Sequence, residues 1–197
     1  MNKKFVLATH NQGKIAEFNL LLKDLSINFA AQSDYGVADI EETGLSFIEN
    51  ALLKAKAYYD RFKVPVIADD SGLNVLALPD ELGLHSARFG GPGLNDKDRA
   101  ELLLKKMDGK AERSAYFSCV LCVYMNEKEI FYFEGRMNGS VGYSYRGSTG
   151  FGYDPVFIPA EKAEEGLTVA ELHEWKQKNS HRSVAVAFAQ KFLGQRN

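Results

Sequence analysis

The order of apolar and polar positions predicts a strand, a turn and a helix at the start of the chain. Lys4 to Thr9 has the composition of a strand, and a second strand is expected near Ile27 to Ala31. Between them, apolar residues recur at three- and four-residue steps, which is the period of a helix with one buried face. The residues with this spacing are Ile15, Phe18, Leu21, Leu22 and Leu25.

A second helix is expected after a polar loop. Ser46-Phe47-Ile48-Glu49 has the pattern of a capping box, and an apolar stripe follows it at Phe47, Ala51, Leu52, Ala55, Tyr59 and Phe62. The short run Val64 to Ala68 predicts a buried strand, and Leu73 to Leu78 predicts another. The acidic segment Asp69 to Gly72 is therefore expected in a connection at a strand end.

The second half of the chain predicts an antiparallel pair of strands with helices around it. A Gly- and Pro-containing loop, Pro79 to Asn95, leads to a helix with Leu103, Leu104 and Met107 inward. Strands at 114–125 and 129–138 form a hairpin through 126–128, and a Gly-rich loop follows at 139–152. A short strand at 156–158 and helices near 168–178 and 182–193 complete the pattern. The sequence predicts one α/β domain over residues 1–197, with a mixed sheet flanked by helices.

Composition and charge narrow the class of ligand. The 197 residues are 45% hydrophobic and 25% charged, which suits one compact unit with a sizeable core. With 24 basic and 26 acidic residues the net charge is −2, so no global positive field would hold a nucleic acid or an anionic membrane. The longest apolar run, Cys119 to Met125, is far shorter than the ~20 residues of a membrane span. We expect a cytoplasmic protein without a nucleic-acid or membrane partner.

The two cysteines have the spacing of a metal or redox motif, but a structural role is favoured. Cys119 and Cys122 lie in a segment rich in β-branched and aromatic residues. Positions three apart on a strand face opposite sides and lie about 10 Å apart, beyond the reach of a disulfide.

A turn at the first helix is a candidate phosphate site. Thr9-His10-Asn11-Gln12-Gly13-Lys14 lies where free backbone N–H groups and the helix dipole favour an anion. It lacks the spacing of a P-loop, which would require Gly at position 8 and Ser or Thr at position 15. From these residues alone, an ordinary turn with a solvated lysine is an equal alternative.

Two acidic pairs are candidate metal ligands. Glu41-Glu42 precedes Thr43-Gly44, and Asp69-Asp70 precedes Ser71-Gly72. Solvated acids are the simpler interpretation, but a buried strand should not end in two uncompensated carboxylates. Oxygen ligands of this kind suit Mg²⁺, which shares its coordination sphere with water and substrate phosphates.

Two later segments are candidates for recognition of a base. Gly150-Phe151-Gly152-Tyr153-Asp154-Pro155 is not a dinucleotide fingerprint, but Phe151 offers a flat face for stacking; a tight turn with a packed Phe is equally compatible. Lys176 and Ser180-His181-Arg182 place cations and a histidine at a junction between helices, where they are either solvated or donate to carbonyl or phosphate oxygens.

Six motifs, taken together and in this order, closely resemble the inosine triphosphate pyrophosphatase family. They are Leu7-Ala8-Thr9-x-Asn11-x-Gly13-Lys14, Glu41-Glu42-Thr43-Gly44 with Phe47-x-Glu49-Asn50-Ala51-x-x-Lys54-Ala55, Ala68 to Leu73, Ser86-Ala87-Arg88, Gly150 to Pro155 and Ser180-His181-Arg182. The resemblance runs from residue 4 to about 188. It implies an elongated mixed sheet, two lobes with a central active-site cleft, a homodimer, and Mg²⁺-dependent hydrolysis of ITP, dITP and XTP to the monophosphate and pyrophosphate.

The resemblance also implies a role for each matching residue. Asp70 would be the general base and, with Glu41, a magnesium ligand. The remaining substrate-binding residues would be Thr9, His10, Asn11, Gln12, Gly13 and Lys14 for the phosphates, with Lys54 and Ser71, and Phe151, Gly152, Tyr153, Asp154, Lys176, His181 and Arg182 for base and sugar. Two positions depart from the family pattern: His10 stands where Gly is common, and Trp175 where an acid often precedes the lysine. Alternatives are a related pyrophosphatase for a modified pyrimidine and a non-catalytic nucleotide sensor, against which Glu41 and Asp70 argue.

Overall fold

The computed structural model describes residues 4–23, 28–31 and 40–195. The chain divides into two compact units, each assembled from separate stretches of sequence. Unit 1 comprises residues 1–70, 119–135 and 182–197, and unit 2 comprises 71–118 and 136–181. The expected central cleft stays a prediction, as does the assignment of residues 1–197 to one domain.

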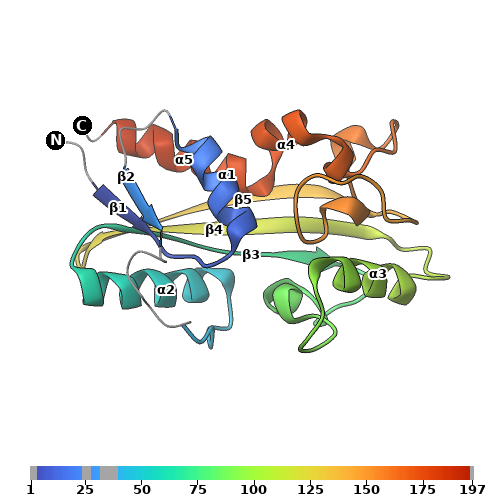
Figure 1. The fold of residues 1–197 in the computed structure, drawn as a ribbon, viewed down its shortest axis with the longest axis horizontal. Coiled ribbons are helices and arrows are strands. Elements are labelled where there is room, and N and C mark those ends of the chain that lie inside the picture. Colours follow the sequence, from blue (N-terminus) through green and yellow to red (C-terminus); the bar gives the residue numbers. More distant parts are fainter. Residues whose placement is uncertain (1–3, 24–27, 32–39, 196–197) are drawn as a thin grey trace. The chain divides into compact units, whose positions relative to one another are not determined.

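A mixed six-stranded sheet runs through the fold in the order β2-β1-β3-β4-β5-β6 (Figure 1). β1 pairs in parallel with β2 and β3, whereas β5 and β6 are antiparallel. The predicted mixed α/β sheet is therefore confirmed. The strands are β1 (Lys4–Leu7), β2 (Asn28–Ala31), β3 (Val66–Val75), β4 (Ser114–Asn126), β5 (Glu129–Val141) and β6 (Phe157–Pro159).

Five α-helices and several 3₁₀ turns accompany the sheet in the described part of the chain. The helices are α1 (Gln12–Leu21), α2 (Phe47–Phe62), α3 (Asp96–Lys106), α4 (His173–Asn179) and α5 (His181–Gly194). The predicted cap of α2 is formed in part, because Ser46 Oγ accepts the Glu49 N–H at 3.2 Å while the Glu49 carboxylate accepts the N–H of Leu45. No helix among the described residues is long and apolar enough to cross a membrane.

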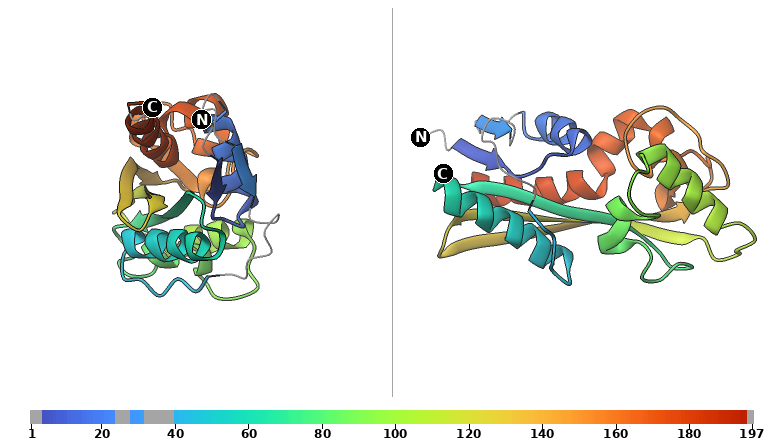
Figure 2. Two further views of the ribbon diagram at one scale, coloured as in Figure 1. Left: turned by 90° about the vertical axis from the view of Figure 1, so that its left-hand side faces the viewer. Right: turned by 60° about the horizontal axis from the view of Figure 1, so that its bottom comes forward.

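In unit 1, helices cover both faces of the sheet, with α1 and α5 on one side and α2 on the other (Figures 1 and 2). The strand residues alternate between these two layers, as a pleated strand requires. Phe5 and Leu7 pack in the core that includes Phe18 of α1 and Ala185 of α5. Val6, Ala8, Val66 and Ala68 pack in the core that includes Ala51, Ala55 and Tyr58 of α2.

The two cysteines follow the same alternation and confirm the structural interpretation. Cys119 lies in the core beneath α1 and α5, and Cys122 lies in the core beneath α2. Both are free and buried. Burial raises the pKa of each thiol to about 12. Opposite faces of one strand therefore hold them apart in an unreactive form.

Unit 2 has a core of its own. Leu103 and Met107 of α3 pack there with Phe117, Val141 and Phe157, and the third predicted inward residue, Leu104, is partly buried against them. The buried side chain of Arg113 links separate segments of unit 2, because its guanidinium donates to the carbonyl oxygens of Met107, Val141 and Gly142.

The predicted break at Asp69 to Gly72 is wrong, because β3 continues without interruption from Val66 to Val75. Gly72 lies against a turn: an added Cβ would come within 2.1 Å of the Gly83 carbonyl oxygen. The acids remain inside the strand because each carboxylate has a cation beside it. Acidic residues alone are therefore no sign of a strand end.

Three smaller boundaries also differ from the prediction. β5 extends to Val141, so it takes the first residues of the expected Gly-rich loop. Asp154–Val156 forms a 3₁₀ turn, and β6 starts at Phe157. The helix predicted near 168–178 is divided into a 3₁₀ turn, Val169–Glu171, and α4, because Leu172 between them leaves the helical conformation with ψ 46°.

Candidate active site

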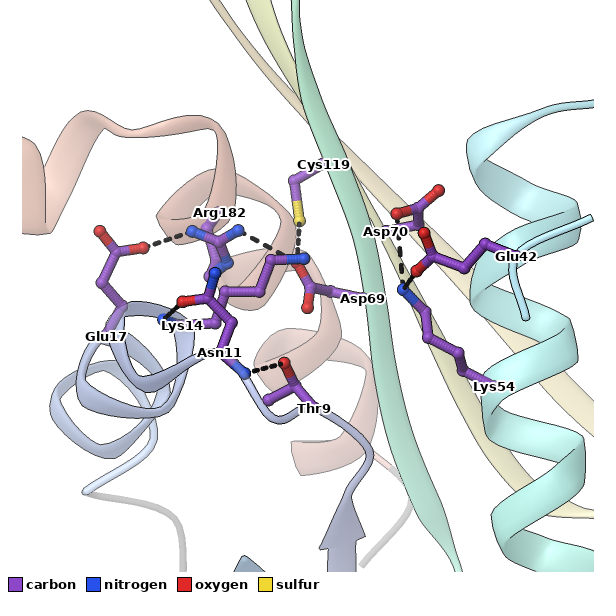
Figure 3. A network of polar contacts seen from close by, with 10 residues as sticks. All are labelled: Thr9, Asn11, Lys14, Glu17, Glu42, Lys54, Asp69, Asp70, Cys119 and Arg182. Atoms are coloured by element: carbon purple, nitrogen blue, oxygen red, sulfur yellow. Dashed lines mark hydrogen bonds and ion pairs between the residues drawn. The ribbon is translucent and has the colours of Figure 1, made fainter. Parts of the chain in front are cut away.

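Two neighbouring carboxylates of β3 organise the polar centre of unit 1 (Figure 3). Asp69 and Asp70 are consecutive in a strand, so their side chains point to opposite faces of the sheet. Asp69 points toward α1 and α5, and Asp70 points toward α2 (Figure 3). Both residues are buried, with exposed fractions of 1% and 6%. Two acids that look equivalent in the sequence thus have different surroundings.

The Asp69 carboxylate is paired with two cations. Its Oδ2 lies 2.9 Å from Lys14 Nζ and 3.0 Å from Arg182 Nη2, and the Cys119 thiol approaches the same oxygen at 3.9 Å. Burial alone would raise the pKa of Asp69, but attraction by Lys14 and Arg182 outweighs it and holds the pKa well below its usual range. Asp69 therefore remains ionised within the core.

Arg182 lies in the first turn of α5 and is fully enclosed, with 1% of its side chain exposed. Its second nitrogen, Nη1, pairs with the Glu17 carboxylate of α1. Arg182 was predicted in a base and sugar pocket. The structure places its guanidinium between the carboxylates of Asp69 and Glu17 in unit 1, and its role in recognition of a base stays a prediction.

Asp70 has a different cation. Lys54 Nζ of α2 lies 3.4 Å from Asp70 Oδ1 and 2.5 Å from Glu42 Oε1. Burial raises the pKa of Asp70, and the neighbouring Lys54 offsets part of that effect. Burial would lower the pKa of Lys54, but the carboxylates around it raise that pKa above its usual value. A buried carboxyl with a raised pKa is well suited to accept a proton.

The second predicted metal ligand, Glu41, is exposed, and its neighbour Glu42 is the acid that reaches Lys54. Sequence reasoning did not assign Glu42, because nothing in an acidic pair says which member turns inward. The carboxylates of Asp70 and Glu42 converge on one ammonium group, so this donor set fits a hard cation such as Mg²⁺. No group of three or more His, Cys, Asp or Glu residues in the described ranges could hold a metal ion. Water and substrate oxygens would therefore have to complete the coordination.

The predicted phosphate turn forms the capped start of α1. Asn11 Oδ1 accepts the N–H of Lys14 at 3.1 Å, and Thr9 Oγ1 accepts the N–H of Asn11 at 3.2 Å. His10 and Gln12 are exposed beside it. The turn therefore presents a helix N-terminus together with Lys14, a combination that favours anions.

In unit 2, the residues predicted for the base form a linked group. Lys176 Nζ lies 2.5 Å from Asp154 Oδ2, and the same oxygen accepts the Phe151 N–H at 2.9 Å. Lys176 Nζ also lies 4.8 Å from the centre of the Phe151 ring. Trp175, the departure from the family pattern, packs partly buried against the core and leaves Lys176 turned toward Asp154.

The other predicted residues of this loop are also placed by contacts within unit 2. The Gly152 N–H donates to Asp96, and the Tyr153 hydroxyl donates to the Ser86 carbonyl at 2.7 Å. His181 is buried and stacks on Phe117 at 4.8 Å with an interplanar angle of 10°. A pocket of about 560 Å³ lies along this loop; its lining residues include Asp96, Tyr145, Gly150, Phe151 and Gly152. Ser71, at the first position of unit 2, is half-buried in β3.

These features define an α/β protein with a cation-balanced acidic centre next to a helix start whose amides and Lys14 favour anions. The model of the Ham1 family matches residues 5–192, and the chain belongs to this family. The resemblance to the inosine triphosphate pyrophosphatase family is thereby confirmed.

Relatives and solved structures match the chain over nearly its whole length. It is 43% identical to a dITP/XTP pyrophosphatase of Leptospira interrogans over 98% of both chains. It is 42% identical to one of Methylococcus capsulatus, covering 95% of this chain and 94% of the relative. The structure of the Staphylococcus aureus Ham1 protein superposes with a TM-score of 0.86 at 38% identity, covering 99% of this chain and all of the other. A HAM1 protein from Coxiella burnetii gives 0.87 at 36% identity, covering 98% and 99%.

Proposed function

We propose that this protein hydrolyses the non-canonical purine nucleoside triphosphates ITP, dITP and XTP to the nucleoside monophosphate and pyrophosphate. The observation that carries the proposal is the buried Asp70 beside Lys54 and Glu42, in a chain whose full-length relatives are named dITP/XTP pyrophosphatases. Such an enzyme removes damaged precursors from the nucleotide pool before they enter DNA or RNA. A cytoplasmic location and a homodimer belong to this proposal.

The reaction requires a water molecule to attack the α-phosphorus while the bond to the pyrophosphate oxygen breaks. Asp70 is proposed to take the proton of that water, a role that its raised pKa suits. Lys54 holds Asp70 in place and offers positive charge beside it. Lys14 and the free amides at the start of α1 would stabilise the negative charge that develops on the departing pyrophosphate.

Magnesium is proposed as the cofactor, held by the carboxylate oxygens of Asp70 and Glu42, with Glu41 as the ligand that the family resemblance implies. Bound there, it would neutralise charge on the triphosphate. The structural support is the convergence of Asp70 and Glu42 on one cation position.

Base recognition is proposed for the linked group of unit 2. Phe151 would stack on the purine, and Lys176 and His181 would donate to the 6-keto oxygen of hypoxanthine or xanthine. Adenine presents an amine at that position, so its binding would leave a donor without an acceptor at a cost of about 1–3 kcal/mol.

The decisive experiment is product analysis with ITP and ATP. We expect ITP to give IMP and pyrophosphate with Mg²⁺ and ATP to be a poor substrate; release of orthophosphate, or equal turnover of both nucleotides, would contradict the proposal. Asp70→Asn should lower turnover by about 10²–10⁴-fold because the general base is lost. Asp108→Asn, at an exposed turn, is the matched control and should retain full turnover.

A further inference from the structure

Asp69 contacts the side chains of Lys14 and Arg182, but it is too deeply buried to contact a substrate itself. Its side chain is fully covered, with 0% exposed, and that of Arg182 is exposed by 1%. Lys14, the third member of this ion cluster, retains 14% exposure. The lysine is therefore the member of the cluster through which Asp69 can influence a bound anion.

The elements that supply these three groups meet on one face of the sheet. β3 lies between β1 and β4, and it carries Asp69 toward the first turns of α1 and α5. Lys14 comes from the first turn of α1, and Arg182 comes from the first turn of α5. A single carboxylate oxygen, Oδ2, contacts both cations at 2.9 and 3.0 Å. This oxygen therefore links cations from two helix starts.

We propose that Asp69 is a positioning residue. It holds the ammonium group of Lys14 beside the start of α1, where that group meets the pyrophosphate end of the substrate. Its role differs from that of the adjacent Asp70, which lies on the opposite face and is the proposed base. The inference rests on the proposed function, since it assigns the ammonium nitrogen of Lys14 to binding pyrophosphate, the leaving group of that reaction.

A double-mutant cycle tests whether Asp69 acts through Lys14. Asp69→Asn removes the charge that orients Lys14, and we expect kcat/KM for ITP to fall about 100-fold, the size of loss that a misplaced binding group produces. The Ki of inorganic pyrophosphate as a competitive inhibitor should rise as well. In the Lys14→Met background, Asp69→Asn should change kcat/KM by less than about twofold, because its target is already gone.

Glu17→Gln is the matched control. Glu17 contacts Arg182 from its other side, and Gln retains an oxygen that can accept from Nη1. We expect its kcat/KM and pyrophosphate Ki to stay within about twofold of the unmodified enzyme. A loss in Glu17→Gln equal to that of Asp69→Asn would overturn the proposal, because the effect would then run through Arg182.

Stability must be separated from positioning, because Asp69→Asn could unfold the protein. Thermal unfolding of each variant checks the fold, and Asp69→Glu, which keeps the charge but moves it by one methylene, replaces Asn in the cycle if the Asn variant does not fold. If the loss of kcat/KM in the double variant equals the product of the losses in Asp69→Asn and Lys14→Met, the inference is refuted. An unchanged pyrophosphate Ki in a folded Asp69 variant would also refute it. Failure of the unmodified protein to hydrolyse ITP would instead refute the proposed function.

Discussion

Replacing Lys176 by methionine would leave the carboxylate of Asp154 buried without its ammonium partner. The two side chains are 8% and 5% exposed and their charged atoms are 2.5 Å apart. With an effective dielectric constant of about 20, attraction at this distance is about 7 kcal/mol. Desolvation of the two ions offsets part of that energy, so we expect Lys176→Met to lower the free energy of unfolding by about 3–5 kcal/mol.

The assay is thermal unfolding followed by circular dichroism. In a chain of 197 residues each kcal/mol corresponds to about 2–4 °C, so the midpoint should fall by about 6–20 °C. Lys178→Met is the matched control, because Lys178 lies exposed on the same helix and its loss should change stability by less than about 0.5 kcal/mol. Adding Asp154→Asn to Lys176→Met should recover part of the loss, since the unpaired charge is gone and an amide oxygen can still accept the Phe151 N–H.

An unfolding midpoint of Lys176→Met within about 2 °C of that of the unmodified protein would refute this reasoning. Such a shift corresponds to a loss of less than about 1 kcal/mol. It would mean that water reaches the pair, or that Asp154 takes up a proton at little cost.

Three further predictions follow from the described residues. Gly72→Ala should destabilise the fold by about 1–3 kcal/mol, because its Cβ would lie 2.1 Å from a carbonyl oxygen of the 83–88 turn, whereas Gly194→Ala meets open space and should be neutral in urea unfolding. The folded-state pKa of Asp69 lies below its unfolded value of 3.8, so the stability that this carboxylate provides is present above pH 4 and is lost as the pH falls; Asp69→Asn should flatten the acid limb of the stability curve, and an unchanged limb would contradict the assignment. Cys119 and Cys122, with pKa values near 12, should resist iodoacetamide in the native protein and react after unfolding, as mass spectrometry can show.

The spacing of apolar residues along the sequence located most of the helices and strands. The stripe that starts at Phe47 marks α2, and the long apolar segment after Ser114 marks β4, because each pattern reports burial by its own element. Asp69 and Asp70 misled the prediction for the opposite reason. Their burial depends on cations from α1, α2 and α5, and no pattern local to β3 can show partners that are so far away in the sequence.

The candidate site was predictable to the level of motifs and not to the level of individual contacts. The segments around Lys14, Asp70 and Lys176 were found because their residue types suit anions, metals and bases. The inward member of the acidic pair is Glu42, and Arg182 is enclosed by carboxylates of unit 1; both facts depend on tertiary packing. The sequence shows which residue types are present, while the direction of each side chain depends on the elements that pack against it in the folded protein.

The position of the two aspartates in the middle of a strand has a consequence for tolerance of insertions. A shift of β3 by one residue would turn each aspartate toward the opposite face of the sheet, because the side-chain period of a strand is two. Asp70, the proposed proton acceptor, would then take the place of Asp69 beside Lys14 and Arg182, and Asp69 would move to the place of Ala68 on the face toward α2. A one-residue deletion in the connection before Val66 should therefore abolish catalysis even in a molecule that still folds, whereas changes within the exposed turn at Glu127-Lys128 leave this pairing intact.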